Sequence, residues 1–595
     1  MRKFSLNPKK KFSTINYIVF GYALVLSFAN LIWLLKWELR QFEIALRLMF
    51  ILYILVQVKK NSAELINYTR KRIKDFSILI FLFFTGTIYT NKYSDLSPDF
   101  ISSHSLMIAA IQNGWNPIFD PNAVDFLTLN PWLSTSNFEF RAETGLASQI
   151  IQSLLNIVLG LENTYFIVNF TFLFLGMRLI QRVVTTICQL NGINNSVTVF
   201  LKRIGVFIFL SPALVFQEVL TGYVDLVTYS ITASIICFLL IYATNVKDCH
   251  NCLYPLLILI ITLPSFKQNF ILISIYAFFG LLLILLMNDS TKAMVDRIRS
   301  ESPVIALSCL FLSVFPGLWT ALRWINGLTP WHLRDGTFEQ VWLGGQPRFY
   351  LDLNGLERMR VVLAGRTSLN PEVPDFTGLF SLPSRDEILN AGYLDNRMGG
   401  LGPLGGDAVF LSILIFLYLV PILFLSSKTR AKFRSNPFII MVLYFSIGFV
   451  LFLLITPMSF MVRYFPHYSL LTLLLFLLIV AAWKDLQVIP LGIRRITQIL
   501  TLSIVTSMGI NSLITASAVI KLNTYNNSRV STLLGVLAES QGETVFIAVN
   551  NKLGFAKRLG FDLLNLPVGV KTITCPAENV VHLFDDEISV CKLNS

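Results

Sequence analysis

The stretch YVDLVTYSITASIICFLLIYA, residues 223–243, decides the class of the fold. It carries one charged residue, Asp225, close to its start, and apolar side chains dominate the rest. A helix needs about 20 residues of this kind to cross the hydrocarbon core of a bilayer, which is about 30 Å thick. We therefore interpret the stretch as a membrane-spanning helix with a carboxylate at its beginning.

Runs of the same kind recur along the whole chain. Its 595 residues are 54% hydrophobic and 14% charged, and the mean hydropathy is +0.64, which is too apolar for a soluble globular protein. The predicted fold class is an α-helical polytopic membrane protein with about 13 transmembrane helices and large extracytoplasmic loops. A hairpin broken at Pro264 is one interpretation of the seventh and eighth runs. The runs lie at residues 17–35, 43–58, 76–90, 165–187, 204–220, 223–243, 253–266, 268–287, 303–322, 407–425, 437–456, 466–483 and 496–518.

The net charge of +13 reports topology rather than a nucleic-acid partner. Short loops on the cytoplasmic side of membrane proteins are enriched in Lys and Arg. With a cytoplasmic N-terminus, and with residues 146–161 not crossing, every basic cluster falls on the cytoplasmic side. We expect a multi-pass protein of the plasma (inner) membrane with an extracytoplasmic C-terminus. The basic clusters occupy residues 2–11, 59–74, 178–203, 292–299, 428–434 and 484–495.

Three segments are expected outside the membrane. The first external loop, 91–164, is acidic and contains the semi-apolar stretch 146–161, whose regular polar interruptions predict a helix at the membrane interface. The long loop 323–406 carries arginines but no lysine, and its apolar content favours an ordered structure. The third is the C-terminal segment. We divide the chain into a membrane domain, 1–519, and a small external domain, 520–595.

The external C-terminal domain has an alternating pattern. Residues 544–549 are typical of a strand, 552–564 of a helix and 568–574 of a second strand, which predicts a small α/β domain. Cys575 and Cys591 would both lie in an oxidising compartment and could pair there. The close pair Cys249 and Cys252 has no second pair nearby, so we do not expect a zinc site.

Candidate functional residues cluster at predicted span ends on the external side. The stretch YSDLSPDFISSH, residues 93–104, follows a span and carries Asp95, Asp99 and His104. Ionisable residues at the membrane are costly and commonly functional. Solvated loop residues are the alternative for these three, as helix capping is for Asp225, lipid snorkelling for Lys267 and Arg463, and a structural role for His104 and His467. The shared side favours one site, which also includes Glu218, Gln268, Asp395 and Arg397.

Group transfer from a phosphate-linked lipid would use such a set. A carboxylate can take the proton of an acceptor hydroxyl as general base. Lys and Arg can hold the leaving phosphate, and Arg can do so with two parallel hydrogen bonds. The 146–161 helix and the apolar spans could form a groove for an isoprenoid tail.

The order of these features over roughly residues 76–470 resembles the GT-C superfamily of membrane glycosyltransferases, in particular bacterial members similar to protein mannosyltransferases and lipid A aminoarabinose transferases. The features are Asp95-Leu-Ser-Pro-Asp99 in the first loop, the interfacial helix, the turns Gly222-Tyr-Val-Asp225 and Ser265-Phe-Lys267, and the late Arg463-Tyr464. The resemblance implies that residues 1–519 form a GT-C-like catalytic domain. It also implies transfer of a hexose or pentose from a polyprenyl phosphate to an extracytoplasmic lipid, glycan or protein.

The resemblance also assigns roles. Asp95 would be the catalytic base, with Asp99 as second choice, and Lys267, Arg463 and Arg397 would bind the donor phosphate. Some GT-C members use Mg²⁺ or Mn²⁺ and others do not; Asp95 and Asp99 would hold the ion. The acidic pair is separated here by three residues, whereas it is adjacent in many members, and no Trp-Trp-Asp motif of oligosaccharyltransferases occurs. Supporting roles would fall to His104, Glu218, Asp225, Gln268, Asp395 and His467.

Two other classes of function remain open. A lipid-linked glycan flippase or secondary transporter would place its charges near the bilayer midplane and often shows two related halves. Here the charges gather at span ends and no repeat is visible. An O-antigen-type polymerase would also have many spans and a long external loop with arginines, but an acidic first loop is not expected of it.

Overall fold

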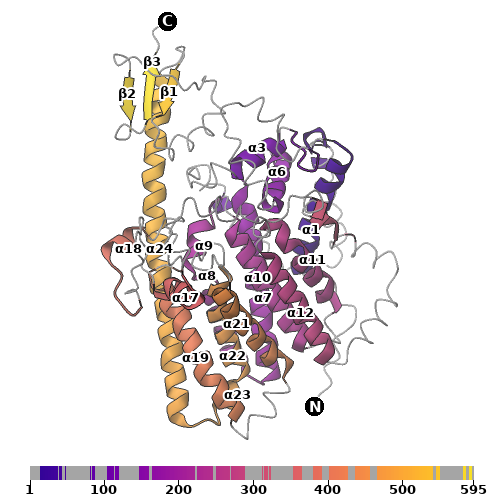
Figure 1. The fold of residues 1–595 in the computed structure, drawn as a ribbon, viewed down its shortest axis with the longest axis vertical. Coiled ribbons are helices and arrows are strands. Elements are labelled where there is room, and N and C mark those ends of the chain that lie inside the picture. Colours follow the sequence, from indigo (N-terminus) through magenta and orange to yellow (C-terminus); the bar gives the residue numbers. More distant parts are fainter. Residues whose placement is uncertain are drawn as a thin grey trace.

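The computed structural model describes a helical bundle with a small sheet near its C-terminus (Figure 1). Apart from short internal gaps, the described residues are 14–37, 104–119, 146–159, 164–287, 353–364, 379–390, 401–425, 436–455, 466–539, 545–549, 580–583 and 588–592, with scattered residues at 39–48, 81–86 and 311–322. The main helices are α1 (Thr14–Leu34), α7 (Tyr165–Leu190), α8 (Asn195–Leu210), α10 (Asp225–Thr244), α11 (His250–Phe266), α12 (Ile271–Met287), α19 (Gly405–Leu425), α21 (Pro437–Ile455), α22 (Leu470–Ala481) and α24 (Leu491–Glu539).

Short helices connect and cover these. They are η1 (Leu39–Phe42), α3 (Ser105–Gln112), α6 (Ala147–Leu159), α9 (Ala213–Glu218), η4 (Phe315–Gly317), α17 (Gly355–Ala364), α18 (Arg385–Asn390), η8 (Pro466–Ser469) and α23 (Trp483–Leu486).

Five helices within the described residues are long and apolar enough to cross a membrane. They are α7, α10, α19, α21 and residues 491–525 of α24, while α1, α11, α12 and α22 contain shorter apolar stretches. The predicted helical class is therefore confirmed, and the length and composition of these helices are consistent with a membrane protein. The predicted spans 43–58, 76–90 and 303–322 lie largely outside the described residues, so the number thirteen stays a prediction.

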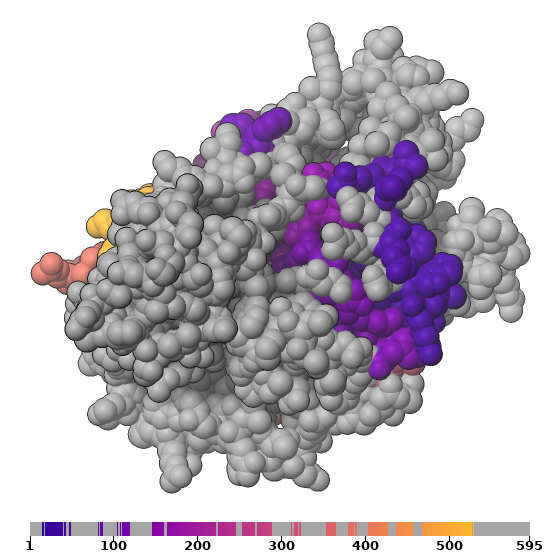
Figure 2. Space-filling view, turned by 90° about the horizontal axis from the view of Figure 1, so that it is seen from above, coloured from indigo at the N-terminus to yellow at the C-terminus, as the bar shows by residue number. Residues whose placement is uncertain are grey.

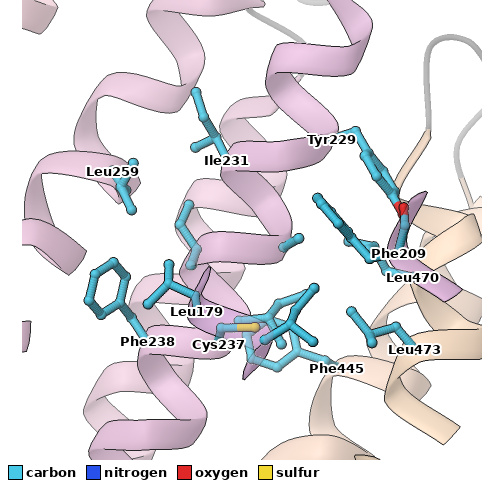
Figure 3. Packing of buried hydrophobic residues seen from close by; sticks show 14 of the residues in the cluster. Leu179, Phe209, Tyr229, Ile231, Cys237, Phe238, Leu259, Phe445, Leu470 and Leu473 are labelled. Carbon is cyan, nitrogen blue, oxygen red and sulfur yellow. The ribbon is translucent and has the colours of Figure 1, made fainter. Parts of the chain in front are cut away.

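Helix α10 is the centre of the bundle. From Asp225 to Ala243 every residue is buried, and the helix packs against α7, α11, α12 and α21. Figure 3 shows this packing, with Cys237 and Phe238 of α10 beside Leu179 of α7 and Phe445 of α21. The rings of Phe209 in α8 and Tyr229 in α10 are stacked, with centroids 5.3 Å apart. A helix that is apolar on all sides is buried on all sides, as its sequence requires.

One predicted span, 204–220, is wrong because of a proline. The expected span 204–220 is divided: α8 ends at Leu210 and α9 begins at Ala213, on either side of Ser211 and Pro212. Pro212 has no N–H to donate, and its own backbone is extended, with a ψ of 143°, so the helix does not continue through it. By contrast, Pro264 lies inside α11 rather than at a break, and the helix ends only after Phe266. Prolines inside membrane helices are tolerated where neighbouring helices pack around them.

The bundle has two ends, which we name by one residue each. The Asp225 end contains the beginnings of α10, α12, α19 and α22 and the last residues of α11 and α21, and lies toward the top of Figure 1. The Lys484 end contains the turn between α7 and α8 and the segment α23. Asn191 joins this turn to the last residues of α22, directly before α23, by donating from its amide to the carbonyl oxygens of Val480 and Ala481, at 3.3 and 3.1 Å.

Helix α6 differs from the helix predicted at a membrane interface. It covers Ala147–Leu159 as expected, but its polar residues are buried inside the protein, with Ser148, Gln149 and Ser153 exposing 0%, 1% and 0% of their surface. The reason is that α6 packs against α1, α3, α7 and α11. Figure 1 shows α3 and α6 together above the Asp225 end.

Within the described parts of the long loop 323–406, α17 and α18 have matching N-terminal caps. Asn354 accepts from the N–H of Glu357 at 3.0 Å while Glu357 accepts from the N–H of Asn354 at 2.8 Å. Ser384 and Glu387 repeat this arrangement at the start of α18, at 3.2 and 2.7 Å. These reciprocal caps satisfy two N–H groups of each short helix and explain why ordered helices form in this loop.

The C-terminal sheet has three antiparallel strands in the order β1 (Val545–Val549), β3 (Ile588–Lys592) and β2 (Val580–Leu583). Strand β1 coincides with the strand expected at 544–549, and Cys591 of β3 lies opposite Phe546 and Val580. The expected helix 552–564, the strand 568–574 and Cys575 lie outside the described residues, so the α/β character and the disulfide stay predictions. Helix α24 continues past residue 519 and ends at Glu539, near the sheet (Figure 1).

Candidate functional site

An acid–base cluster lies where α10 begins. Asp225 is the first residue of α10, Glu218 is the last residue of α9, and Lys267 directly follows α11. The Lys267 Nζ atom forms an ion pair with the Asp225 Oδ1 atom. The exposed fractions are 0% for Glu218, 1% for Asp225 and 8% for Lys267. Because buried charges require partners, this pairing explains how two ionised groups are kept away from water.

Glu218 binds the N-terminus of α10. Its Oε2 atom accepts a hydrogen bond of 2.7 Å from the N–H of Leu226, one of the groups that the helix itself cannot satisfy. Its Oε1 atom is buried and, among the described residues, has no hydrogen-bond partner. Burial, and secondarily the nearby Asp225 carboxylate, raise the pKa of the Glu218 carboxyl well above its usual range. The cluster therefore places a carboxyl with a raised pKa beside the Asp225–Lys267 ion pair.

Asn169 of α7 holds the connection between α9 and α10. Its Nδ2 atom donates to the carbonyl oxygens of Glu218 and Thr221, each at 2.8 Å. The Thr221 hydroxyl also donates to the Glu218 carbonyl, at 3.1 Å. Asn169 is fully buried, so this amide fixes the position of the loop between the two carboxylates. Sequence reasoning missed Asn169; its only signal is a polar residue within the predicted span 165–187.

His467 lies at the same end, inside an aromatic shell. It belongs to η8, which packs against α10, and exposes 0% of its surface. Its ring centroid is 4.8 Å from that of Phe449 and 6.1 Å from that of Phe270. The Phe270 N–H donates to the Lys267 carbonyl at 3.0 Å, so His467 is a neighbour of the segment that carries Lys267.

His104 belongs to a second polar cluster, on α6. Its Nδ1 atom is 2.5 Å from the Nε2 atom of Gln149, and both residues are buried. Gln152 donates to the Ser148 hydroxyl at 3.0 Å, and Thr164 donates to the Asn156 side chain at 2.5 Å. The buried polar face of α6 is therefore a network of amides, hydroxyls and one imidazole.

An apolar contact connects the two clusters. Ile108 of α3 packs with Tyr165 and Phe166 of α7, and Leu220, which follows α9, packs against this group. Ser153 of α6 donates to the Ile108 carbonyl at 3.3 Å. The polar face of α6 and the loop beside Glu218 are thus attached to the same packed residues at the Asp225 end.

The structure brings together three of the predicted site residues and places two others at the same end. Glu218, Asp225 and Lys267 form one cluster, whereas His104 and His467 occupy neighbouring positions. The snorkelling interpretation of Lys267 is wrong, because its ammonium is paired with Asp225 inside the protein. Asp95, Asp99, Gln268, Asp395, Arg397 and Arg463 lie outside the described residues.

The described carboxylate pair does not fit a divalent cation. Lys267 already supplies a positive charge to Asp225, and one oxygen of Glu218 already accepts from the Leu226 N–H. No group of three or more possible ligands occurs within the described part of the chain. Asp95 and Asp99, the predicted metal ligands, are not among those residues.

Seen from above in Figure 2, most of the described indigo-to-magenta surface lies on the right, with a separate purple patch near the top, and salmon and yellow surface lies at the left edge. No family model, no curated protein and no solved structure matches this chain.

Proposed function

We propose that this chain is an integral membrane glycosyltransferase of the inverting type. It would transfer one sugar from a polyprenyl-phosphate donor to an extracytoplasmic lipid, glycan or protein acceptor, at the Asp225 end of the bundle. The observation that supports the proposal is the buried cluster of Glu218, Asp225 and Lys267 at a span end. Ionisable groups in such positions are expensive to bury and are usually functional.

The transfer itself needs one base and a site for the leaving group. The acceptor oxygen forms a bond to the anomeric carbon while the bond from that carbon to the phosphate oxygen breaks, and the electron pair leaves with the polyprenyl phosphate. In this proposal Asp95, with Asp99 as second choice, takes the acceptor proton. The loop that carries both leads into His104, which contacts Gln149 of α6.

The leaving phosphate gains negative charge, which cations must stabilise. Lys267 has three N–H donors, so one can stay with Asp225 while another meets a phosphate oxygen. Arg397 and Arg463 are proposed to complete the phosphate site. A protonated Glu218 would avoid repelling the anion while still capping α10.

A transporter or flippase is the second candidate, because the same burial favours it. Three ionisable groups inside a helical bundle are also typical of ion or proton pathways. The two candidates differ in their product: a transferase releases free polyprenyl phosphate, whereas a flippase moves an intact lipid between leaflets. Release of polyprenyl phosphate from a labelled donor by the purified full chain in vesicles would favour transfer; movement without release would favour transport.

Gene deletion tests the proposal even while the sugar and the acceptor are unidentified. We expect deletion to change the mass of one surface or lipid-linked glycan by a single sugar residue. Restoring wild-type protein should restore the mass, and restoring the Asp95→Asn variant, produced at the same level, should not. An envelope with unchanged glycan masses would contradict the proposal.

The proposed topology has its own test. The basic clusters support a cytoplasmic N-terminus and an extracytoplasmic C-terminus in the plasma membrane. A tag after residue 595 should be cleaved by protease added outside intact spheroplasts, whereas a tag before residue 1 should be protected. A protected C-terminal tag would place Asp225 on the wrong side for this reaction.

A further inference from the structure

The polar face of α6 contains two buried amides with unsatisfied groups. The Oε1 atoms of Gln149 and Gln152 have no hydrogen-bond partner within the described part of the chain. Each side chain is 1% exposed, so bulk water does not reach them. Buried polar groups in folded proteins are nearly always paired, and each exception requires an explanation.

Turning the two amides does not remove the unsatisfied hydrogen-bonding groups. Oxygen and nitrogen of a Gln side chain exchange places when the amide is turned by half a rotation. In the orientation described above, Nε2 of Gln149 meets His104 and Nε2 of Gln152 donates to Ser148. If either amide is turned, its oxygen faces that partner and its N–H group becomes the unsatisfied one. One polar group of each amide stays unpaired in both orientations.

This property selects the chemical class of the missing partner. A cation would satisfy only the oxygens, and an anion would satisfy only the N–H groups. A hydroxyl both donates and accepts, so it fits either orientation of both amides. Gln149 and Gln152 lie three residues apart on one helix, where side chains are neighbours, so a ligand with adjacent hydroxyls can meet both.

The position of α6 connects this face to the proposed phosphate site. Helix α6 packs against α11, which ends at Phe266, immediately before Lys267. It is also attached, through Ser153 and Ile108, to the residues packed beside Leu220 and Glu218. Helix α6 therefore packs against the helix that precedes Lys267, which is why we relate its polar face to a sugar linked to a phosphate at Lys267.

We propose that Gln149 and Gln152 form a subsite for the hydroxyl groups of the donor sugar. The inference rests on the proposed glycosyl transfer and adds to it the part of the protein that recognises the sugar. The subsite is uncharged and consists of two amides supported by His104 and Ser148. It fits a neutral polyol rather than a sugar with a carboxylate or phosphate on its ring.

The test compares two lipids that differ only by the sugar. Binding of undecaprenyl phosphate and of undecaprenyl-phosphate-linked neutral hexoses and pentoses is measured on the full chain in nanodiscs. We expect wild-type protein to prefer at least one glycosylated lipid. The Gln152→Leu variant should weaken the binding of that lipid by about tenfold, the equivalent of one lost hydrogen bond. Its affinity for bare undecaprenyl phosphate should be unchanged.

Stability separates a binding role from a structural one. Leucine removes the unsatisfied Gln152 oxygen and also the hydrogen bond to Ser148, so Gln152→Leu should change the thermal midpoint of the ligand-free protein little. Gln189→Leu is the matched control, because Gln189 is exposed near the Lys484 end. This variant should bind both lipids as tightly as wild type does. A Gln152→Leu protein that unfolds at a lower temperature and loses both lipids equally would overturn the subsite.

The remaining outcomes distinguish this inference from the proposed function. If Gln149→Leu and Gln152→Leu bind the preferred glycosylated lipid as tightly as wild type, the subsite is overturned while glycosyl transfer stands, and buried water would account for the amides. If wild-type protein binds the glycosylated lipids no more tightly than undecaprenyl phosphate, the subsite is also overturned. If it binds neither kind of lipid, the proposed function fails and the subsite fails with it.

Discussion

The two ends of the bundle differ in how far the charged residues compared here are exposed to solvent. At the Lys484 end, the basic residues Arg203, Lys484 and Arg495 are exposed, as short loops on the water side allow. At the Asp225 end, Glu218, Asp225 and Lys267 are buried, and they are joined to an ion pair, a helix N-terminus and an amide from α7. An exposed charge costs little free energy and can reflect membrane topology alone. A buried charge needs a compensating partner, and its presence therefore indicates a function.

The largest expected effect comes from removing the buried cation. Lys267→Met deprives the buried Asp225 carboxylate of its lysine partner and should lower the free energy of unfolding by about 3–5 kcal/mol. Lys484→Met, at an exposed lysine, should change it by less than about 1 kcal/mol. Thermal unfolding in detergent measures both. Adding Asp225→Asn to Lys267→Met should recover much of the loss; equal effects of the two lysine variants would refute the contrast between the ends.

Two asparagine substitutions, one at each end of the bundle, give a second matched comparison. Asn169→Leu removes the donor to two carbonyl oxygens beside Glu218 and should cost about 2–3 kcal/mol. Asn191→Leu removes a comparable donor to Val480 and Ala481, but this site is partly exposed, and we expect about 1 kcal/mol. Only Asn169→Leu should also reduce donor binding, as measured with undecaprenyl phosphate. Reduced binding in Asn191→Leu instead would move the site to the other end.

The raised pKa of Glu218 predicts a pH dependence with a definite sign. A carboxyl whose pKa is higher in the folded state binds its proton more tightly there, so this stabilisation is complete below the unfolded pKa of about 4.3. It is lost as the pH rises through the folded pKa, by about 1 kcal/mol per pH unit. Glu218→Gln should flatten that part of the stability profile, and Asp485→Asn should not. A wild-type profile that rises with pH, and that Glu218→Gln flattens, would contradict the assignment.

The smallest effect is expected in the turn at the Lys484 end. Gly192 has a φ of +59°, and a Cβ atom there would meet only the Lys484 Nζ atom, at an ordinary contact distance of 3.6 Å. Gly192→Ala should therefore cost only backbone strain, about 1 kcal/mol, with no change in lipid binding. Thermal unfolding and the undecaprenyl phosphate titration check both statements; a binding defect would show that this end also contributes to the site.

The long apolar runs made the bundle predictable. The sequence predicted α7, α10, α19 and α21 to within a few residues, because continuous apolar segments of this length form helices long enough to cross a membrane. It missed the division at Ser211 and Pro212, since apolar residues continue on both sides of it. It also missed how far α24 extends, since the helix continues into the polar residues beyond 518 without an apolar signal.

The sequence predicted that the candidate residues lie on one side of the membrane, but it did not predict which of them contact one another. Topology alone places Asp225 and Lys267 at the same end, yet their pairing depends on how α10 packs against α11. The role of Asn169 could not be predicted because its partners are backbone carbonyls of a distant loop. The burial of α6 was missed for a similar reason: amphipathic periodicity gives the polar face, but not whether water or protein covers it.

The most direct measurement of the central claim is the release of polyprenyl phosphate from a labelled glycosyl donor by the purified full chain. We expect release by wild-type protein and by Lys484→Met, loss of release in Asp95→Asn, and weaker donor binding when Asp225→Asn and Lys267→Met are combined. Undiminished release in both Asp95→Asn and the combined variant would contradict the claim that the Asp225 end carries the reaction.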